Sequence, residues 1–409
     1  MNKILIICQK MPSEYASFVK SEINGSGGWI DGFIDGVKSI NEYKFYFMFE
    51  GLEENYKQIN NIHFIQATRE NFEKEINDIN PSIIQIFGTE FIGNYQVRID
   101  NRYVVWIQGL LKPYTRQIRI NSNSYFNFSN IFKKFIYQLV RYNEIKGFEK
   151  RSKEESNLLK KVENVIGRTE WDYSVVRSIN DGLHYHNCNE LIRDSFYKSK
   201  KWNFQQIEKY SIYITQANYC IKGLHTILSS IKLVKDLFPH VKVYISGGNP
   251  RKNTSLPARL GVSYTSYLIH EISNLSLESN IIFLGNLDSD QVVERMLKSH
   301  VFLLPSLIEN SCNSLLEAQT LGVPVVASYV GGTPEYIDDG KNGLMYPCFE
   351  SELLANKLIK LFKDEEFCKN LSFCEINSTS EDILKLKFKD NIRYIYSDII
   401  NRNSEVKKR

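Results

Sequence analysis

The chain has 409 residues, of which 43% are hydrophobic and 24% are charged. Because one hydrophobic core rarely serves so long a chain, we expect two domains. The formal net charge of +4 is small for this length and does not suggest a nucleic-acid partner, and no apolar run approaches the roughly 20 residues that span a bilayer.

The N-terminal apolar stretch from Ile4 to Cys8 predicts a buried first strand, since it is too short for the core of a signal peptide. The seven cysteines are an odd set without a C-x-x-C motif, which argues against a disulfide framework and against a zinc site. We therefore expect a reducing compartment, the cytoplasm.

Apolar strand-like runs then alternate with helical stretches along both halves of the chain. The strand-like runs are 3–8, 44–49, 62–67, 82–87 and 103–108 in the first half, and 211–217, 241–247, 280–285, 300–305 and 324–328 in the second. This alternation predicts an α/β fold with two Rossmann-like, doubly wound domains. We place them at residues 1–200 and 201–381, and we expect a final helix over about 382–401 to pack back on the first domain.

The most informative segment of the second domain is 299–337. A buried strand ends at Pro305, a polar loop follows, and helical spacing then runs over 313–321. Ligands of such sheets bind beyond the carboxyl ends of the strands, where the start of a helix offers backbone N–H groups to an anion. The segment therefore predicts a phosphate site at the start of this helix, formed by Asn310, Ser311, Cys312 and Asn313.

Two glutamates belong to the same segment, Glu309 before the helix and Glu317 within it. A carboxylate in the second position can accept paired hydrogen bonds from ribose hydroxyls, as in dinucleotide sites. For either glutamate taken alone, an ordinary solvated surface residue is the commoner interpretation. The setting favours a site, because the helix is largely apolar and a second tight turn, Gly331–Glu335, follows the next strand at the same rim.

This segment resembles the donor-binding half of retaining family 4 glycosyltransferases, which have two Rossmann-like domains facing each other across a cleft, the GT-B fold. The resemblance implies that Glu309 lies near the transferred sugar and Glu317 on the donor ribose. It extends to Lys222, just after the first strand of the second domain, and implies that this lysine binds the donor diphosphate. It also implies that the donor base lies near the loop that begins at Gly285.

The resemblance continues into the first domain and covers nearly all of the chain. Gly27 and Gly28, which precede Trp29, resemble the family's glycine loop near the donor phosphate and the acceptor. The residues after the strands 82–87 and 103–108, together with the stretch 167–172 that contains Arg168, look like the polysaccharide-assembly branch of the family.

Two positions depart from the family pattern. Many members have an arginine six residues before the lysine, where this chain has Gln216, so charge neutralisation is expected from Lys222, the helix start and Arg168. Many members also have a histidine at the end of the strand 104–108, where this chain has Gln108. Glutamine cannot act as a general base at neutral pH, which weakens any mechanism built on an enzymic base there.

The resemblance implies a retaining transferase of surface polysaccharide biosynthesis. It would move a hexose-type sugar from a nucleotide-sugar donor to a saccharide or polyprenyl-diphosphate-linked acceptor. We expect no cofactor and no metal ion, because the histidines are scattered and the pair His184 and His186 favours loop packing. The alternatives are a nucleotide-sugar epimerase or phosphorylase, and a catalytically inactive homologue that acts as the partner of another transferase.

The stretch 111–151 is basic, since it contains nine lysines and arginines but only two glutamates. Apolar residues at three- and four-residue spacing lie beside Lys133, Lys134 and Arg141. This pattern is compatible with a helix lying on an anionic membrane surface, and we predict peripheral association with the inner face of the plasma membrane. An ordinary helix packed on the first domain is the alternative. The apolar residues are Ile131, Phe132, Phe135, Ile136, Leu139 and Val140.

Overall fold

The computed structural model of the chain describes residues 1–8, 11–18, 28–89, 98–121, 131–216, 219–378 and 381–406. The chain forms two compact units. The first unit comprises residues 1–112, 149–194 and 381–409, and the second comprises 113–148 and 195–380. Within the described part of the chain, none of the helices combines the length and the apolarity of a membrane span.

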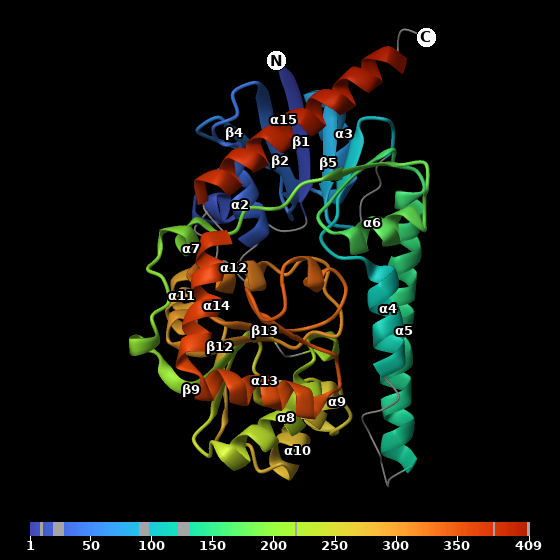
Figure 1. The fold of residues 1–409 in the computed structure, drawn as a ribbon. Coiled ribbons are helices and arrows are strands. Elements are labelled where there is room, and N and C mark those ends of the chain that lie inside the picture. Colours follow the sequence, from blue (N-terminus) through green and yellow to red (C-terminus); the bar gives the residue numbers. More distant parts are fainter. Residues whose placement is uncertain are drawn as a thin grey trace. The chain divides into compact units, whose positions relative to one another are not determined.

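The described residues of the first unit contain an eight-stranded sheet in the order β3-β4-β2-β1-β5-β6-β7-β8 (Figure 1). All neighbouring strands are parallel except β3 and β4, which are antiparallel. The strands are β1 (Asn2–Cys8), β2 (Tyr43–Glu50), β3 (Asn55–Ile59), β4 (Ile62–Ala67), β5 (Ile83–Phe87), β6 (Tyr103–Trp106), β7 (Asn164–Gly167) and β8 (His184–Asn187). The helices of this unit are α1 (Ser13–Phe18), α2 (Gly28–Val37), α3 (Phe72–Ile79), α6 (Glu170–Arg177) and α15 (Glu381–Val406).

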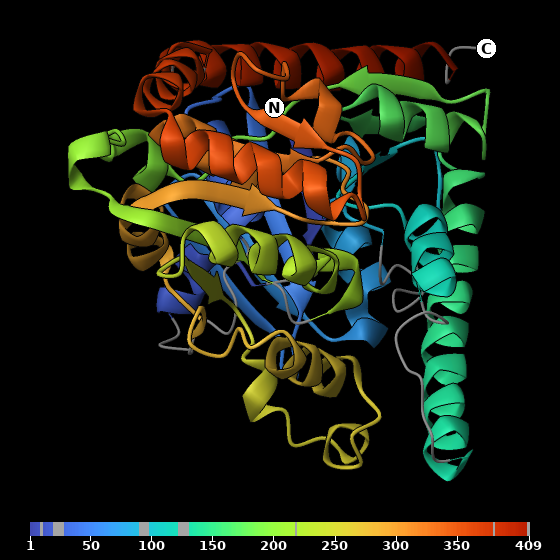
Figure 2. The ribbon, with the colours of Figure 1, turned by 60° about the horizontal axis from the view of Figure 1, so that its bottom comes forward.

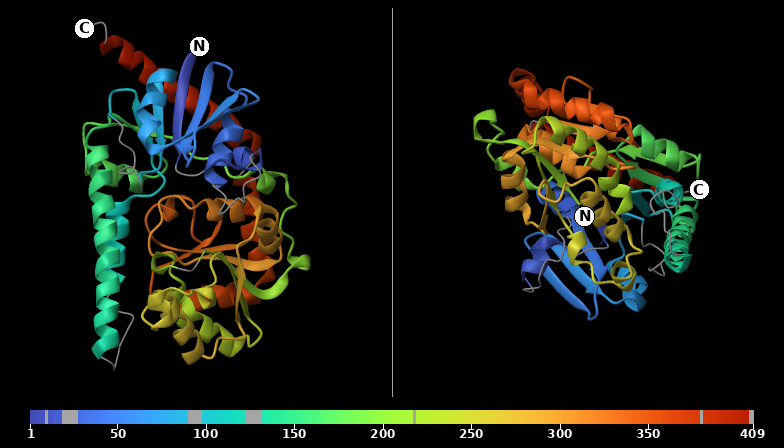
Figure 3. Two further views of the ribbon diagram at one scale, coloured as in Figure 1. Left: turned by 180° about the vertical axis from the view of Figure 1, so that it is seen from behind. Right: turned by 90° about the horizontal axis from the view of Figure 1, so that it is seen from below.

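Alternate residues of β1 enter two separate apolar cores, one on each face of the first sheet. Ile4 and Ile6 join the core that contains Phe388 of α15, whereas Leu5 and Ile7 join the other. The reason is the two-residue period of a strand, which sends neighbouring side chains to opposite faces. Helix α15 lies across the strands in Figure 1 and behind them in Figure 3, left. The C-terminal helix is therefore part of the first unit's core.

The second unit contains a parallel sheet of six strands among its described residues, in the order β11-β10-β9-β12-β13-β14. Numbered from β9, this is the order 3-2-1-4-5-6 of a Rossmann fold, whose order reverses between β9 and β12. Helices α8 and α13 pack side by side (Figure 2). The strands are β9 (Glu208–Thr215), β10 (Lys242–Ser246), β11 (Ile281–Gly285), β12 (Ser299–Leu304), β13 (Val325–Ser328) and β14 (Leu344–Tyr346). The helices are α7 (Asp194–Lys198), α8 (Leu224–Leu237), α9 (Leu256–Arg259), α10 (Tyr264–Asn274), α11 (Ser289–Leu297), α12 (Asn313–Leu321), α13 (Ser351–Lys363) and α14 (Glu365–Ser378).

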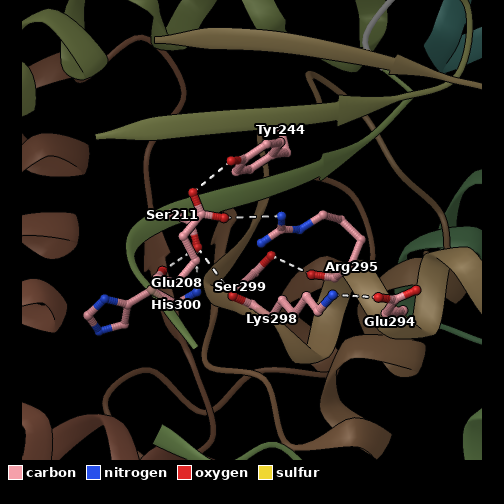
Figure 4. Close-up of polar contacts among 8 residues, drawn as sticks. All are labelled: Glu208, Ser211, Tyr244, Glu294, Arg295, Lys298, Ser299 and His300. Atoms are coloured by element: carbon pink, nitrogen blue, oxygen red, sulfur yellow. Dashed lines mark hydrogen bonds and ion pairs between the residues drawn. The ribbon is translucent and has the colours of Figure 1, made fainter. Parts of the chain in front are cut away.

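A polar cluster joins the amino ends of the central strands of the second sheet (Figure 4). The Glu208 carboxylate, at the start of β9, accepts a hydrogen bond from the Tyr244 hydroxyl at 2.7 Å and lies 3.2 Å from Nη1 of Arg295. The Arg295 guanidinium also stacks 4.0 Å from the centroid of the Tyr244 ring. The Ser211 hydroxyl accepts a 3.1 Å hydrogen bond from the backbone N–H of His300. These contacts hold β9, β10 and β12 in register at the edge opposite their carboxyl ends.

The division of the chain differs from the predicted boundary at residue 200. The units divide at residues 194 and 195, and residues 113–148 belong to the second unit. This segment contains most of α4 (Leu111–Asn121) and the first part of α5 (Ile131–Leu159). Tyr137 of α5 is buried, and Nζ of Lys133 in the same helix would lie 3.8 Å from a Cβ on Gly261, so this part of α5 approaches the second unit.

Candidate active site of the second unit

The site begins at the point where the strand order reverses. β9 ends at Thr215 and β12 ends at Leu304, and each leads into a loop at the carboxyl edge of the sheet. The loop after β9 carries Lys222 at the end of a short 3-10 turn, and the loop after β12 carries Glu309. A parallel sheet leaves a ligand crevice between two such loops. The topology therefore brings together two residues predicted from separate motifs.

Two glycines allow the backbones of these loops to approach closely. Gly223 has φ +74°, and a Cβ there would lie 1.8 Å from the carbonyl oxygen of Pro305. Gly331 has φ +52°, and a Cβ there would lie 1.9 Å from the carbonyl oxygen of Glu309. A backbone hydrogen bond of 2.8 Å from Leu307 to the Ile221 carbonyl joins the same loops. Only glycine meets both the conformation and the space at these two positions.

Lys222 and Glu309 form an ion pair at this edge. Nζ of Lys222 lies 2.6 Å from Oε1 of Glu309, which also accepts a 2.7 Å hydrogen bond from the Ser306 hydroxyl. The side chains are 20% and 8% exposed, respectively. Burial is the largest single effect and lowers the pKa of Lys222, but the Glu309 carboxylate and the neighbouring Tyr219 and Cys312 together outweigh it, so the pKa lies well above its ordinary value. The lysine is therefore a permanent cation at the mouth of the crevice.

Helix α12 begins next to this pair, as the sequence predicts. Its N-cap is Cys312, which makes no side-chain capping hydrogen bond, so the backbone N–H groups of the first turn have no cap from that side chain. The Ser311 hydroxyl is buried and makes no hydrogen bond within the described residues. The Thr215 hydroxyl, at the end of β9, donates a 3.0 Å hydrogen bond to Ser314 in the first turn. Asn310 and Asn313 lie in the same segment, which offers a polar cradle for an anion.

Glu309 and Glu317 are not solvated surface residues. Glu309 is 6% and Glu317 is 5% exposed, although both lie at the edge of the sheet where a ligand would bind. Burial of a carboxylate is costly without polar partners, and surface glutamates are seldom so enclosed. The surface interpretation of these two residues is therefore wrong.

Gln216 and Gly285 belong to two further loops of the same carboxyl edge. Gln216 follows β9 directly, has φ +50° and is exposed. Gly285 ends β11 with φ +79°, and its carbonyl accepts a 2.7 Å hydrogen bond from the N–H of Gly247 after β10. Nothing lies within 4 Å of a Cβ placed on Gly285. The residue therefore leaves open space at the position predicted to face the donor base.

In the first unit, three side chains meet beyond the carboxyl ends of β6, β7 and β8. Nη1 of Arg168 lies 2.9 Å from Oε2 of Glu190, and both side chains are almost completely buried. The Gln108 side-chain amide donates a hydrogen bond to the other oxygen of Glu190, and the backbone carbonyl of Gln108 accepts one of 3.2 Å from Arg168. Because its charge is already matched by a buried carboxylate, Arg168 is part of a structural network in this state.

The sequence did not single out Glu190, although it follows a strand in the same way as Glu309 does. Of the predicted glycine loop, Gly27 lies outside the described residues, and Gly28 and Trp29 begin α2. His186 is buried in β8, and burial followed by the nearby Arg402 lowers its pKa to about 4. His186 thus packs as a neutral residue, but the predicted loop packing of the pair is wrong, because both histidines lie in strand β8 and His184 is exposed.

Comparison with known proteins identifies relatives of this chain. Residues 194–373 match the family described as "Glycosyl transferases group 1". N-acetyl-alpha-D-glucosaminyl L-malate synthase of Bacillus anthracis is 27% identical over 208 residues, which are 51% of this chain and 50% of that protein. The capsular polysaccharide biosynthesis glycosyltransferase CapM of Staphylococcus aureus is 25% identical over 144 residues, or 35% of this chain and 34% of that protein. The chain thus matches half or less of the length of these curated relatives.

Solved structures show the same architecture. HepE of Anabaena, in complex with UDP-glucose, has a TM-score of 0.63 and 15% sequence identity, covering 99% of this chain and 100% of that one. At this identity the likeness shows the fold alone, and that fold is GT-B, with two parallel-sheet domains. The predicted α/β class with two doubly wound domains is confirmed.

Proposed function

We propose that this chain, which belongs to the group 1 glycosyltransferases through its residues 194–373, moves a hexose-type sugar from a nucleotide-sugar to a saccharide or lipid-linked saccharide acceptor. The observation that carries the proposal is the pairing of Lys222 with Glu309 where the order of the second sheet reverses. The relatives support the substrate class, because HepE was solved with UDP-glucose and CapM is named for capsular polysaccharide biosynthesis.

In the proposed reaction the bond between the anomeric carbon and the donor diphosphate breaks, and the acceptor hydroxyl enters from the same face. The diphosphate leaves with additional negative charge, so a preorganised cation and backbone N–H groups beside it lower the barrier. Lys222 and the first turn of α12 supply these groups. We propose that this arrangement needs no metal ion.

Glu317 is proposed to bind the ribose hydroxyls of the donor. It lies in the second turn of α12, one turn further from the crevice than the proposed phosphate cradle. Glu309 is proposed to face the transferred sugar, where its charge stabilises the positive anomeric carbon of the transition state. Its two partners, Lys222 and Ser306, fix the orientation of its carboxylate.

Helix α5 is proposed to rest on an anionic membrane surface and so to bring the transferase to a lipid-linked acceptor. Phe132 and Phe135 are 69% and 62% exposed, and Ile131, Leu139 and Tyr142 are also exposed on the same side. Within 131–143 the sequence has no acidic residue. Arg141 does not contribute to this surface, because it is buried and pairs with Glu144 at 2.6 Å. The surface charge therefore comes from Lys133 and Lys134.

Acceptor-dependent release of free nucleoside diphosphate tests the proposal. A panel of UDP-, GDP- and ADP-sugars is first screened for protection against thermal unfolding, since a ligand that binds the native state raises Tm. The protecting donor is then incubated with and without a saccharide acceptor. Transfer predicts release that requires the acceptor. Conversion of the donor to an isomeric nucleotide-sugar would instead identify an epimerase, and donor binding without turnover with any acceptor would identify an inactive homologue.

A further inference from the structure

A second polar cavity lies in the second unit, and neither Lys222 nor Glu309 lines it. It has a volume of about 450 Å³, within the range of ligand pockets, and none of its lining residues carries a negative charge. Three cations line it, namely Lys133, Arg251 and Arg259. A cavity with three positive charges and no carboxylate attracts an anion.

The chain that forms this cavity is held by its own hydrogen bonds. The Asn253 amide donates a 2.9 Å hydrogen bond to the Thr265 hydroxyl, which lies 2.8 Å from the Ser263 hydroxyl. The Ser266 hydroxyl donates a 3.1 Å hydrogen bond to the Ala258 carbonyl. These bonds link the start of α10 to α9 and to the turn before it. The polar wall is therefore preorganised, which reduces the entropy cost of binding.

Lys133 belongs to α5 and connects the cavity to the apolar surface of that helix. A Cβ on Gly261 would lie 3.8 Å from Nζ of Lys133, so the ammonium approaches the loop between α9 and α10. The neighbouring Phe132 and the next turn's Phe135 are two exposed aromatic residues of α5. One short stretch of helix thus contributes both an apolar surface and a cation of the cavity.

We propose that this cavity binds the terminal phosphate or diphosphate group of a membrane lipid whose chain lies along the apolar surface of α5. The proposal rests on the proposed lipid-linked acceptor and names the residues that hold its phosphate. Three cations match a phosphomonoester or diphosphate, which carries about two negative charges or more, better than the single charge of a phosphodiester headgroup. Arg251 lies five residues after the end of β10, in the turn that follows the carboxyl end of that strand.

The test is sedimentation of the full chain with phosphatidylcholine vesicles that contain either polyprenyl phosphate or phosphatidylglycerol at equal total charge. We expect binding to polyprenyl phosphate vesicles to be at least about tenfold tighter, because two or more charge-assisted hydrogen bonds are available only there. The double variant Arg251→Gln and Arg259→Gln should lose this preference and keep the weaker binding. The matched control Lys363→Gln, an exposed lysine of α13 outside the cavity, should behave as the native chain.

Several results would overturn the assignment. The first is equal binding of the native chain to vesicles with polyprenyl phosphate and to vesicles with phosphatidylglycerol. The second is a preference for polyprenyl phosphate that survives in the double variant. A third is binding of inorganic pyrophosphate that depends on Arg251 and Arg259 while the vesicles show no preference, which would make the ligand a soluble phosphate. Nucleoside diphosphate affinity is measured in parallel. If the native chain lacks it, the transferase proposal fails separately, whereas the double variant should keep the native value.

Discussion

Nζ of Lys222 and Oε1 of Glu309 lie 2.6 Å apart, although 87 positions separate the two residues in the chain. The pair closes the gap between the loops after β9 and β12, and a 3.1 Å backbone hydrogen bond from Gly332 holds the Glu309 carbonyl from the other side. A diphosphate that binds here must share the lysine with Glu309. The cation is thus in place before the ligand arrives, as electrostatic preorganisation requires.

We predict that Gly223→Ala abolishes donor binding and lowers the stability of the second unit. Its Cβ would lie 1.8 Å from the Pro305 carbonyl, so the loop that carries Glu309 must move. Gly340→Ala is the matched control, because its φ of +86° is equally unfavourable for alanine but its Cβ would meet open space. The control should lower the free energy of unfolding by about 1–2 kcal/mol and leave the donor affinity unchanged. Equal effects of both changes on donor affinity would show that the close approach at Gly223 is unimportant.

The buried pair Arg168–Glu190 should matter for the stability of the first unit. Glu190→Gln leaves a buried guanidinium without its counter-charge, and such a loss costs about 3–5 kcal/mol. Changing both residues, Arg168→Met with Glu190→Leu, should recover much of this loss. The control is Arg102→Gln, whose pair with Asp100 is partly exposed and should contribute less than about 1 kcal/mol. Denaturant unfolding measures the series, and a negligible effect of Glu190→Gln would refute the structural role.

Acid should destabilise the second unit through His300. Burial lowers the pKa of this histidine from 6.5 to about 4, whereas the unfolded chain keeps the ordinary value. Between these values the unfolded state binds the proton and the native state does not, so stability is complete above about pH 6.5 and is lost as the pH falls towards 4. His300→Gln should reduce the fall in Tm across this window, and exposed His240→Gln should not. An unchanged pH dependence in His300→Gln would contradict the buried neutral histidine.

Substitutions of Glu309 and Glu317 should affect different kinetic constants. Glu317→Ala should mainly weaken donor binding, because a bidentate charged hydrogen bond to ribose is worth about 1.5–3 kcal/mol. Glu309→Gln should instead lower kcat with a smaller effect on KM, since its charge is proposed to act in the transition state. Circular dichroism checks that both variants fold. Native kinetics in either variant would remove that residue from the site.

Local sequence signals predicted the second unit well because its site is built from contiguous motifs. The strand, loop and helix around Glu309 lie in one segment, and Gly223 and Gly331 mark the turns that approach it. The pairing of Lys222 with Glu309 needed the strand order, which a single sequence does not display. A site can be predicted from the sequence where the local periodicity and the positions of the glycines agree with the sheet topology.

The contacts of the first unit were harder to predict from the sequence, because they join segments that are distant in the chain. Glu190 pairs with Arg168 and Gln108 only because β6, β7 and β8 are neighbours, and nothing beside Glu190 in the sequence indicates a carboxylate of importance. The helical spacing of α5 was predicted, but the spacing does not say which face packs. The structure turns Tyr137 and Arg141 inward and leaves Phe132 and Phe135 exposed.

The most direct test of the central claim is calorimetric binding of UDP and of uridine to four proteins. These are the native chain, Lys222→Ala, Glu309→Gln and the double variant. If Lys222 binds the donor diphosphate, Lys222→Ala weakens the binding of UDP by about tenfold or more and leaves the affinity for uridine unchanged. The double variant then binds UDP as weakly as Lys222→Ala does. If Lys222 only neutralises Glu309, the double variant recovers native UDP affinity. That recovery, or an equal weakening of UDP and uridine, would contradict the account.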